Sequence, residues 1–113
     1  MHCATATKKD LVRIADGLRT SPELDLLAAR LNLLGNGTRL RLFRILLEAR
    51  EVCVCDLAEM LGITVSAVSQ HLAKFKAHGL MRTRRDASTI YYSLADHPFN
   101  DMAKRSVLKG LDA

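Results

Sequence analysis

The sequence predicts a mainly helical domain that carries one β-hairpin, arranged as a winged helix-turn-helix. Three observations lead to this class. Apolar residues recur at helical spacing along most of residues 11–78. A short turn, GIT at residues 62–64, separates two of these helical segments. Residues 80–94 then alternate apolar and polar side chains on both sides of a polar centre, as the strands of a hairpin do.

Length and composition limit what the chain can be. Its 113 residues are enough for one domain with a modest core. No apolar stretch approaches the roughly 20 residues that a membrane span needs. The first residues lack a secretory signal pattern, so we expect a cytoplasmic protein whose three cysteines are free thiols or metal ligands.

The charge balance favours an anionic partner. Lys and Arg total 17 against 12 Asp and Glu, a net charge of +5. On so small a domain, nucleic acid is the commonest partner of such a charge. A surface that is merely soluble is the alternative.

The N-terminal part is expected to form an arm and two helices. Residues 1–9 show no apolar period, which indicates a mobile arm ahead of a single domain at 10–113. A first helix begins its apolar spacing at Leu11 and is interrupted by Gly17. A second helix, at about 23–34, has more apolar surface than one buried stripe needs, which indicates a core helix or a subunit interface.

A third helix is expected from a cap at Thr38 to about Ala49. Apolar residues at helical spacing should face mostly inward, namely Leu40, Phe43, Ile45, Leu46 and Leu47.

The helix-turn-helix is expected at about residues 54–78. Gly62 is free to take the positive φ that the turn needs, and Gly79 closes the second helix. Thr64 or Ser66 can cap that second helix.

The wing and a last helix complete the domain. We expect the wing at about 80–94 and the last helix at about 97–110, started by Asp96 and Pro98.

The second helix of the helix-turn-helix is the candidate DNA reader. Its buried stripe should consist of Val65, Val68, Leu72 and Phe75. The other side combines small residues with polar tips, which suits the major groove, although any surface helix has a solvated face. The candidate DNA-binding residues of this helix are Ser66, Ala67, Ser69, Gln70 and Lys74.

Arginines on the hairpin strengthen the DNA interpretation. Arg82, Arg84 and Arg85 lie on its first strand and at the approach to its turn. A wing at this place touches backbone phosphates or enters the minor groove. His71 and His78 are expected to have capping or packing roles.

The segment EVCVCD holds Cys53 and Cys55, here called the cysteine pair. The two residues are either buried apolar side chains or thiolate ligands of a soft metal. On a regular helix their side chains would point about 200° apart, so both can face one ion only at an extended start or first turn. The β-branched segment and Asp56 at the start of the next helix favour such a start.

Two sulfurs make an incomplete metal site. Thiolates select Zn, Cd, Pb, Cu(I) or As(III) over Mg or Ca. Cys3, the remaining thiol, lies beside His2 in the expected arm, and together they can complete a site of three or four ligands. A terminus with no role in metal binding is the alternative.

Three segments together resemble the ArsR/SmtB family of winged-helix metalloregulators over roughly residues 30–95: LLGNGTRLRLFRILL, EVCVCDLAEMLGITVSAVSQHLAKFKAHGLM and TRRDASTIYYSL. The resemblance implies a homodimeric repressor that sits on operator DNA without metal and releases it when metal binds. It also implies that the cysteine pair binds the metal, with Cys3 as a ligand often donated by the other subunit and Asp56 as a further candidate.

The resemblance also indicates a branch of the family. Arsenic-sensing relatives add a third Cys after CVCDL, where this sequence has Ala58, so the chain looks more like the Cd, Pb and Zn branch. A second family site uses an Asp/His pair near the last helix. Asp96 and His97 match its first half, but residues 98–113 contain no His or Glu, so we expect Asp96 to be the helix cap.

The expected function is therefore a repressor released by Cd, Pb or Zn. Its dimer would be built by the helix at 23–34 with the first and last helices. A repressor that responds to As(III), Cu(I) or Ag, or a thiol redox switch, is the alternative. We expect no enzyme, because no His, Asp or Asn is visibly paired with a Cys and the sequence has no phosphate-binding loop.

Overall fold

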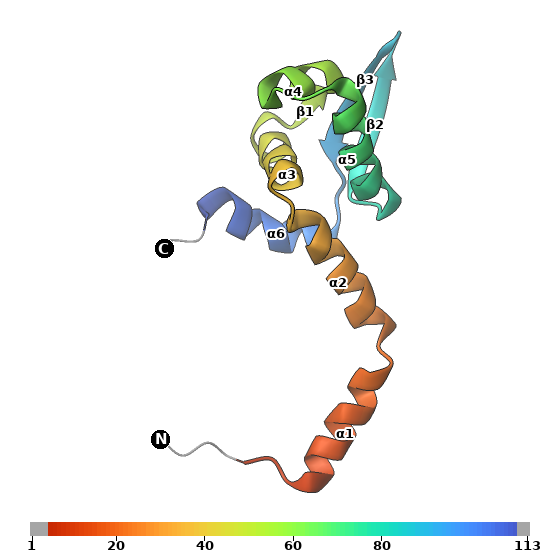
Figure 1. The fold of residues 1–113 in the computed structure, drawn as a ribbon, viewed down its shortest axis with the longest axis vertical. Helices are drawn as coiled ribbons and strands as arrows, with labels where there is room; N and C mark the ends of the chain where they lie inside the picture. Colours follow the sequence, from red (N-terminus) through yellow and green to blue (C-terminus); the bar gives the residue numbers. More distant parts are fainter. Residues whose placement is uncertain (1–4, 111–113) are drawn as a thin grey trace.

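A computed structural model of the chain describes residues 5–110. The elements in this part are α1 (Lys8–Arg19), α2 (Pro22–Leu34), α3 (Gly37–Ala49), β1 (Glu51–Cys53), α4 (Val54–Leu61), α5 (Val65–Ala77), β2 (Met81–Asp86), β3 (Thr89–Leu94) and α6 (Pro98–Lys109). Two helices, α4 and α5, are joined by a short turn and followed by the β2–β3 hairpin, which we call the wing (Figure 1). The predicted class, a mainly helical winged helix-turn-helix, is confirmed.

The molecule has a compact body and a long stem. Helices α3 to α6 and the three strands form the body, while α2 leads away from it and α1 continues the stem (Figure 1). The extents are 61 × 32 × 22 Å. Helix α1 has no buried residue and α2 buries only Leu33, so the stem leaves its apolar side chains exposed. Helix α1 begins at Lys8, so residues 8 and 9 of the expected arm are helical.

The core lies where α3, α4, α5 and the base of the wing meet. The rings of Phe43 on α3 and Phe75 on α5 lie 6.3 Å apart, centroid to centroid. The buried residues of the core are Leu33, Leu42, Phe43, Leu46, Leu57, Ala58, Val68, Leu72, Phe75, Leu80, Met81, Phe99 and Ala103. Their side chains fix the angle between the two helices of the helix-turn-helix.

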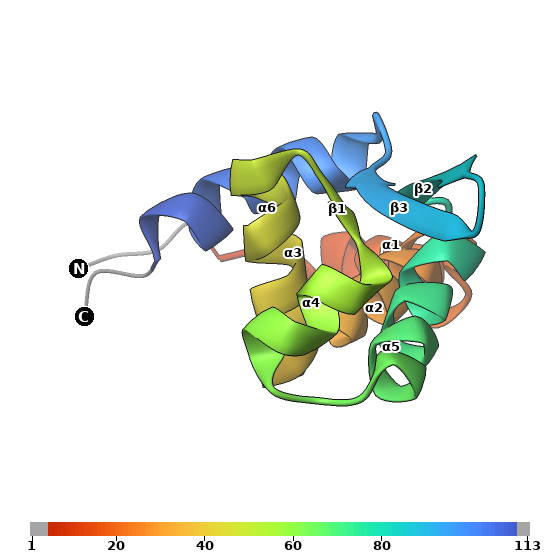
Figure 2. The same cartoon turned by 90° about the horizontal axis from the view of Figure 1, so that it is seen from above.

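A small sheet connects the wing to the rest of the body. Its strand order is β1-β3-β2, with both pairs antiparallel (Figure 2). Helix α6 is tied to the base of the wing by the buried side chain of Asn100, whose Nδ2 donates to the carbonyl oxygens of Leu80 and Ala95 at 3.0 and 2.9 Å. The wing is therefore held at both sides, by β1 and by α6.

Three expectations about helix continuity and burial were wrong. Gly17 does not interrupt α1, because helical geometry tolerates an exposed glycine at modest cost. Val65, expected in the buried stripe, is 44% exposed because it is the first residue of α5 and lies beyond the core. On α3, Leu40 is 40% exposed, and Leu42 takes the inward position instead.

The caps of α3 and α6 were also misassigned. Asn36, and not Thr38, caps α3, since its Oδ1 accepts from the backbone N–H of Arg39 at 3.1 Å. His97, and not Asp96, caps α6, since its Nδ1 accepts from the N–H of Phe99 at 3.0 Å. The chain enters helical geometry two residues before the expected cap of α3 and one residue after that of α6.

The cap assignment of α3 makes a testable prediction. Asn36→Ala should lower the free energy of unfolding by about 1 kcal/mol, because it leaves the N–H of Arg39 without its acceptor. Thr38→Ala, the matched control inside the first turn, should change it by less than about 0.5 kcal/mol. Urea unfolding followed by circular dichroism measures both, and an equal loss in the two variants would contradict the assignment.

Candidate nucleic-acid interface and metal centre

Helix α5 occupies the position of a recognition helix, as the second helix of the helix-turn-helix. The hydroxyl Oγ1 of Thr64 caps it by accepting from the N–H of Ala67 at 3.0 Å, and Gly62 takes the left-handed conformation in the turn, with φ 66°. Val68, Leu72 and Phe75 anchor one side of the helix in the core. The buried stripe thereby fixes which side of the helix faces solvent.

The predicted DNA-reading residues of α5 lie largely on that solvent side. Ser66, Gln70 and Lys74 are exposed, while Ala67 and Ser69 are half-buried. A helix with small residues around one exposed amide fits closely into a major groove, where Gln bonds to the edge of adenine. The chemistry of this face is compatible with base reading.

His71 on the same helix is half-buried and has a lowered pKa. Loss of solvation is the main cause, and the positive charges of Arg39 and Lys74 add to it. The residue therefore belongs to the packing of α5, as the sequence indicates, and burial disfavours its protonated form.

The lowered pKa of His71 makes stability depend on pH. The unfolded chain binds a proton at His71 more readily than the folded protein does. The contribution of neutral His71 to the free energy of unfolding is therefore present above the ordinary pKa of 6.5 and is lost as the pH falls toward the folded pKa. We expect His71→Gln to lose less stability than the wild type between about pH 7.5 and about pH 5.5. Urea midpoints at the two pH values test this, and identical losses would rule His71 out as a contributor.

The wing arginines divide into two kinds. Arg82 and Arg85 are exposed, and neither makes an ion pair within residues 5–110. Arg84 donates three hydrogen bonds to the carboxylate of Glu51, from Nη2 to Oε1 at 2.7 Å and from Nε to Oε2 and Oε1 at 3.1 and 3.3 Å. Its guanidinium also lies 4.6 Å from the centroid of the Tyr91 ring. Arg84 would have to leave these partners to contact DNA.

The Glu51–Arg84 interaction also affects the pKa of each residue. Hydrogen bonds from Arg84 lower the pKa of Glu51, and the same contact raises that of Arg84. Both groups are thus held in their charged forms. The sequence did not reveal this pair, because 33 positions separate its members and only the register of the sheet brings them together.

The cysteine pair lies at the junction of β1 and α4. Cys53 ends β1 and occupies the cap position of α4 with extended backbone, φ −75° and ψ 154°. Cys55 and Asp56 lie exposed in the first turn of α4. Both cysteines are free thiols, and Cys53 is half-buried. The pair therefore stands at an extended start of a helix, the one place where residues i and i+2 can face the same ion.

The donor set near this junction fits a soft cation. Thiolate sulfur selects soft metal ions such as Zn, Cd and Pb over Mg or Ca. Among residues 5–110, no group of three or more His, Cys, Asp and Glu side chains is positioned to hold a metal. Cys3 and His2, the expected completing ligands, lie outside the described residues.

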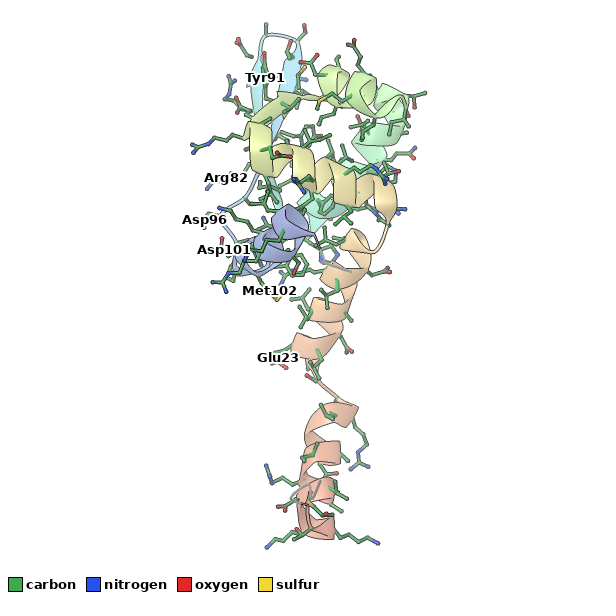
Figure 3. The ribbon with its side chains drawn as sticks, turned by 90° about the vertical axis from the view of Figure 1, so that its left-hand side faces the viewer. Glu23, Arg82, Tyr91, Asp96, Asp101 and Met102 are labelled. Atoms are coloured by element: carbon green, nitrogen blue, oxygen red, sulfur yellow. The ribbon has the colours of Figure 1, made fainter. Side chains whose placement is uncertain are left out.

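The structure also reveals a large apolar surface that a single chain does not cover. Figure 3 shows Met102 on α6 close to the body end of the stem, with Glu23 farther out along α2. The exposed apolar residues of the stem and α6 are Leu11, Val12, Ile14, Leu18, Leu24, Leu26, Leu27, Leu31 and Met102. Of the two sequence interpretations of α2, a core helix is wrong and an interface helix remains.

No helix among the described residues combines the length and apolar character needed to span a bilayer.

A recognition helix next to an arginine-bearing wing defines the class of winged-helix DNA-binding regulators. The family model described as bacterial regulatory protein, arsR family, matches residues 36–83, from the cap of α3 into β2. The chain also resembles the crystal structure of the AntR antimony-specific transcriptional repressor, with 32% identity and a TM-score of 0.68, over 83% of this chain and 81% of that one. The chain belongs to the ArsR family.

Two curated proteins are similar to part of this chain. The nodulation protein NolR of Rhizobium meliloti is 42% identical over 71 residues, covering 63% of this chain and 57% of NolR. The cadmium resistance transcriptional regulatory protein CadC homolog of Staphylococcus aureus is 29% identical over 75 residues, covering 66% of this chain and 62% of that protein. The matches thus span less than two thirds of either relative. The family consists of transcriptional regulators and not of enzymes.

Proposed function

We propose that this protein is a cytoplasmic, homodimeric repressor that binds operator DNA and releases it when a thiophilic metal ion, Cd, Pb or Zn, binds the cysteine pair. One observation carries the proposal. Cys53 and Cys55 lie at the first turn of α4, which is the first helix of the helix-turn-helix. A ligand held there acts directly on the element that positions the recognition helix.

The DNA-binding part of the proposal uses two surfaces. Gln70 and Ser66 on α5 would read base edges in the major groove. Arg82 and Arg85 on the wing, together with Lys74, would contact phosphates. Arg84 is the exception among the predicted contacts, because Glu51 and Tyr91 already engage its guanidinium.

The homodimer is supported by the uncovered apolar surface of α1, α2 and α6. Nine large apolar side chains of these helices are exposed among the described residues, and a second copy of the same stem would bury them. Two recognition helices would then face successive major grooves, about 34 Å apart, on a palindromic site.

In the metal-loaded state, the thiolates of Cys53 and Cys55 would hold the ion, with Asp56 and the N-terminal Cys3 or His2 as candidate further donors. These donors together would cross-link the start of α4 to the residues before α1. That link favours a dimer geometry that fits DNA less well, with a coupling of roughly 1 to 3 kcal/mol. By reciprocity, bound DNA weakens metal binding by the same factor.

A trivalent metalloid is the second candidate inducer. The likeness to the antimony-specific repressor AntR favours it, because antimony and arsenic both prefer sulfur ligands. The absence of a third Cys at Ala58 favours the divalent ions instead. A thiol redox switch remains a third candidate, since the exposed Cys55 is open to oxidants.

Binding to the promoter of its own gene tests the repressor proposal. Fluorescence anisotropy with labelled DNA from upstream of that gene should show an affinity at least about 1,000-fold higher than for a random duplex of equal length. The reduced, metal-free protein is used, and analytical ultracentrifugation on the same sample should give a dimer. Equal affinity for the two duplexes would reject sequence-specific repression.

A further inference from the structure

Four side chains line up across one face of the small sheet. Cys53 on β1 pairs with Tyr91 on β3, and Tyr91 pairs with Arg84 on β2. Directly paired residues of an antiparallel ladder project from the same face of the sheet. Glu51 lies two residues before Cys53 and shares this face because side chains alternate along a strand. The row therefore reaches from the cysteine pair to the wing.

Contacts in this row connect the two outer strands. Arg84 reaches past the ring of Tyr91 on the central strand and forms its hydrogen bonds with Glu51 on β1. The planar guanidinium meets the carboxylate with two N–H groups, which fixes the relative orientation of the two side chains. Figure 3 shows Tyr91 in the outer part of the wing, with Arg82 nearer its base.

The strand that carries Glu51 is short and starts from an unusual backbone. Arg50 has φ 67° and ψ −57°, the rare and strained γ-turn region for a residue with a Cβ. Only the three residues of β1 separate this turn from α4. Cys53 and Glu51 lie on the same three-residue strand, so a displacement of Cys53 also displaces Glu51.

We infer that Glu51, Arg84 and Tyr91 form a brace that couples the cysteine pair to the position of the wing. The inference rests on the proposed function for its ligand, and it goes further by naming the residues that carry the signal. Binding of a cation by the thiolate of Cys53 would shift β1. Glu51 would move with β1, and Arg84 would transfer that movement to β2. Glu51 and Arg84 are positioning residues in this mechanism, and neither binds the ion or DNA.

The exposure of the pair fits a positioning role. The side chains of Arg84 and Glu51 are 54% and 38% exposed, and ion pairs so open to solvent contribute little to folding. Substitutions in the brace should therefore leave a folded protein in which coupling can be measured.

The first test measures coupling with Cd²⁺ as the probe. For Glu51→Gln, the ratio of DNA affinities between metal-free and Cd²⁺-loaded protein should fall at least about fivefold. Metal-free DNA affinity and Cd²⁺ affinity should each change by less than about twofold. Arg84→Met should behave the same way, whereas the control Arg85→Met should weaken DNA binding and keep the ratio. If Arg84→Met instead weakens metal-free DNA binding with an unchanged ratio, Arg84 contacts DNA and the brace is rejected.

A second readout is independent of metal. In the metal-free protein, amide hydrogen exchange of residues 82–86 should be faster in Glu51→Gln than in the wild type, and the Glu51→Gln, Arg84→Met double variant should add nothing further. Glu48→Gln, on α3, serves as the control. If Cd²⁺ fails to release the wild type from DNA, the proposed function is wrong. In that case the exchange measurement alone shows whether Glu51 and Arg84 restrain the wing. Unchanged exchange in Glu51→Gln would overturn it.

Discussion

A protein with both Cys53→Ser and Cys55→Ser should bind its operator with wild-type affinity and stay bound when cadmium is added. The two thiolates are the soft donors at the start of α4, and a hydroxyl does not replace a thiolate toward such an ion. The coupling of roughly 1 to 3 kcal/mol should fall to zero. Anisotropy of labelled operator DNA during an anaerobic Cd²⁺ titration measures the effect.

Met60 provides the matched control for this variant. It is 59% exposed on the same helix, so Met60→Leu removes a neighbouring sulfur without touching the cysteine pair. Release should be unchanged in Met60→Leu. If the double serine variant is still released by Cd²⁺ at wild-type concentrations, the cysteine pair is not the sensor.

Gln70→Ala should lower the affinity for operator DNA by about 10- to 100-fold, which is the contribution of one bidentate contact to a base. Gln70 is exposed on α5, opposite the buried stripe, and its amide is suited to adenine. Affinity for a random duplex should change little, because phosphate contacts supply most of that binding. Anisotropy with both duplexes at the same salt concentration gives the two numbers.

Lys74→Gln is the comparison for a phosphate contact. It should weaken binding to both duplexes about equally and reduce the slope of log affinity against log salt by about 1. If Gln70→Ala shows this uniform pattern instead, α5 does not read bases through Gln70.

Local sequence rules predicted the class of fold because its strongest signals are local. The left-handed Gly62 between two apolar periods indicates the turn, and the polar centre at residues 86–88 indicates the hairpin. The caps were harder to predict, because several polar residues precede each helix. Asn36 and Thr38 are both good capping types, and only the backbone decides which one faces the free N–H groups.

The candidate site was also predicted only in part, and again the local features were the predictable ones. The position of Cys53 and Cys55 at an extended helix start followed from side-chain directions alone, and the structure agrees. The partnership of Arg84 with Glu51 did not follow, since it depends on the register of strands that are distant in sequence. The exposure of α2 was one of two interpretations left open, because an excess of leucines suits a core or an interface equally well.

The central claim, that a thiophilic ion on the cysteine pair weakens DNA binding, has one most direct test. In an anaerobic Cd²⁺ titration of the protein–operator complex, thiolate–metal absorbance and DNA anisotropy are recorded on the same sample. We expect the anisotropy to fall in proportion to the rise in absorbance. Saturating absorbance with unchanged anisotropy would contradict the claim, because metal would then occupy the thiolates without releasing the DNA.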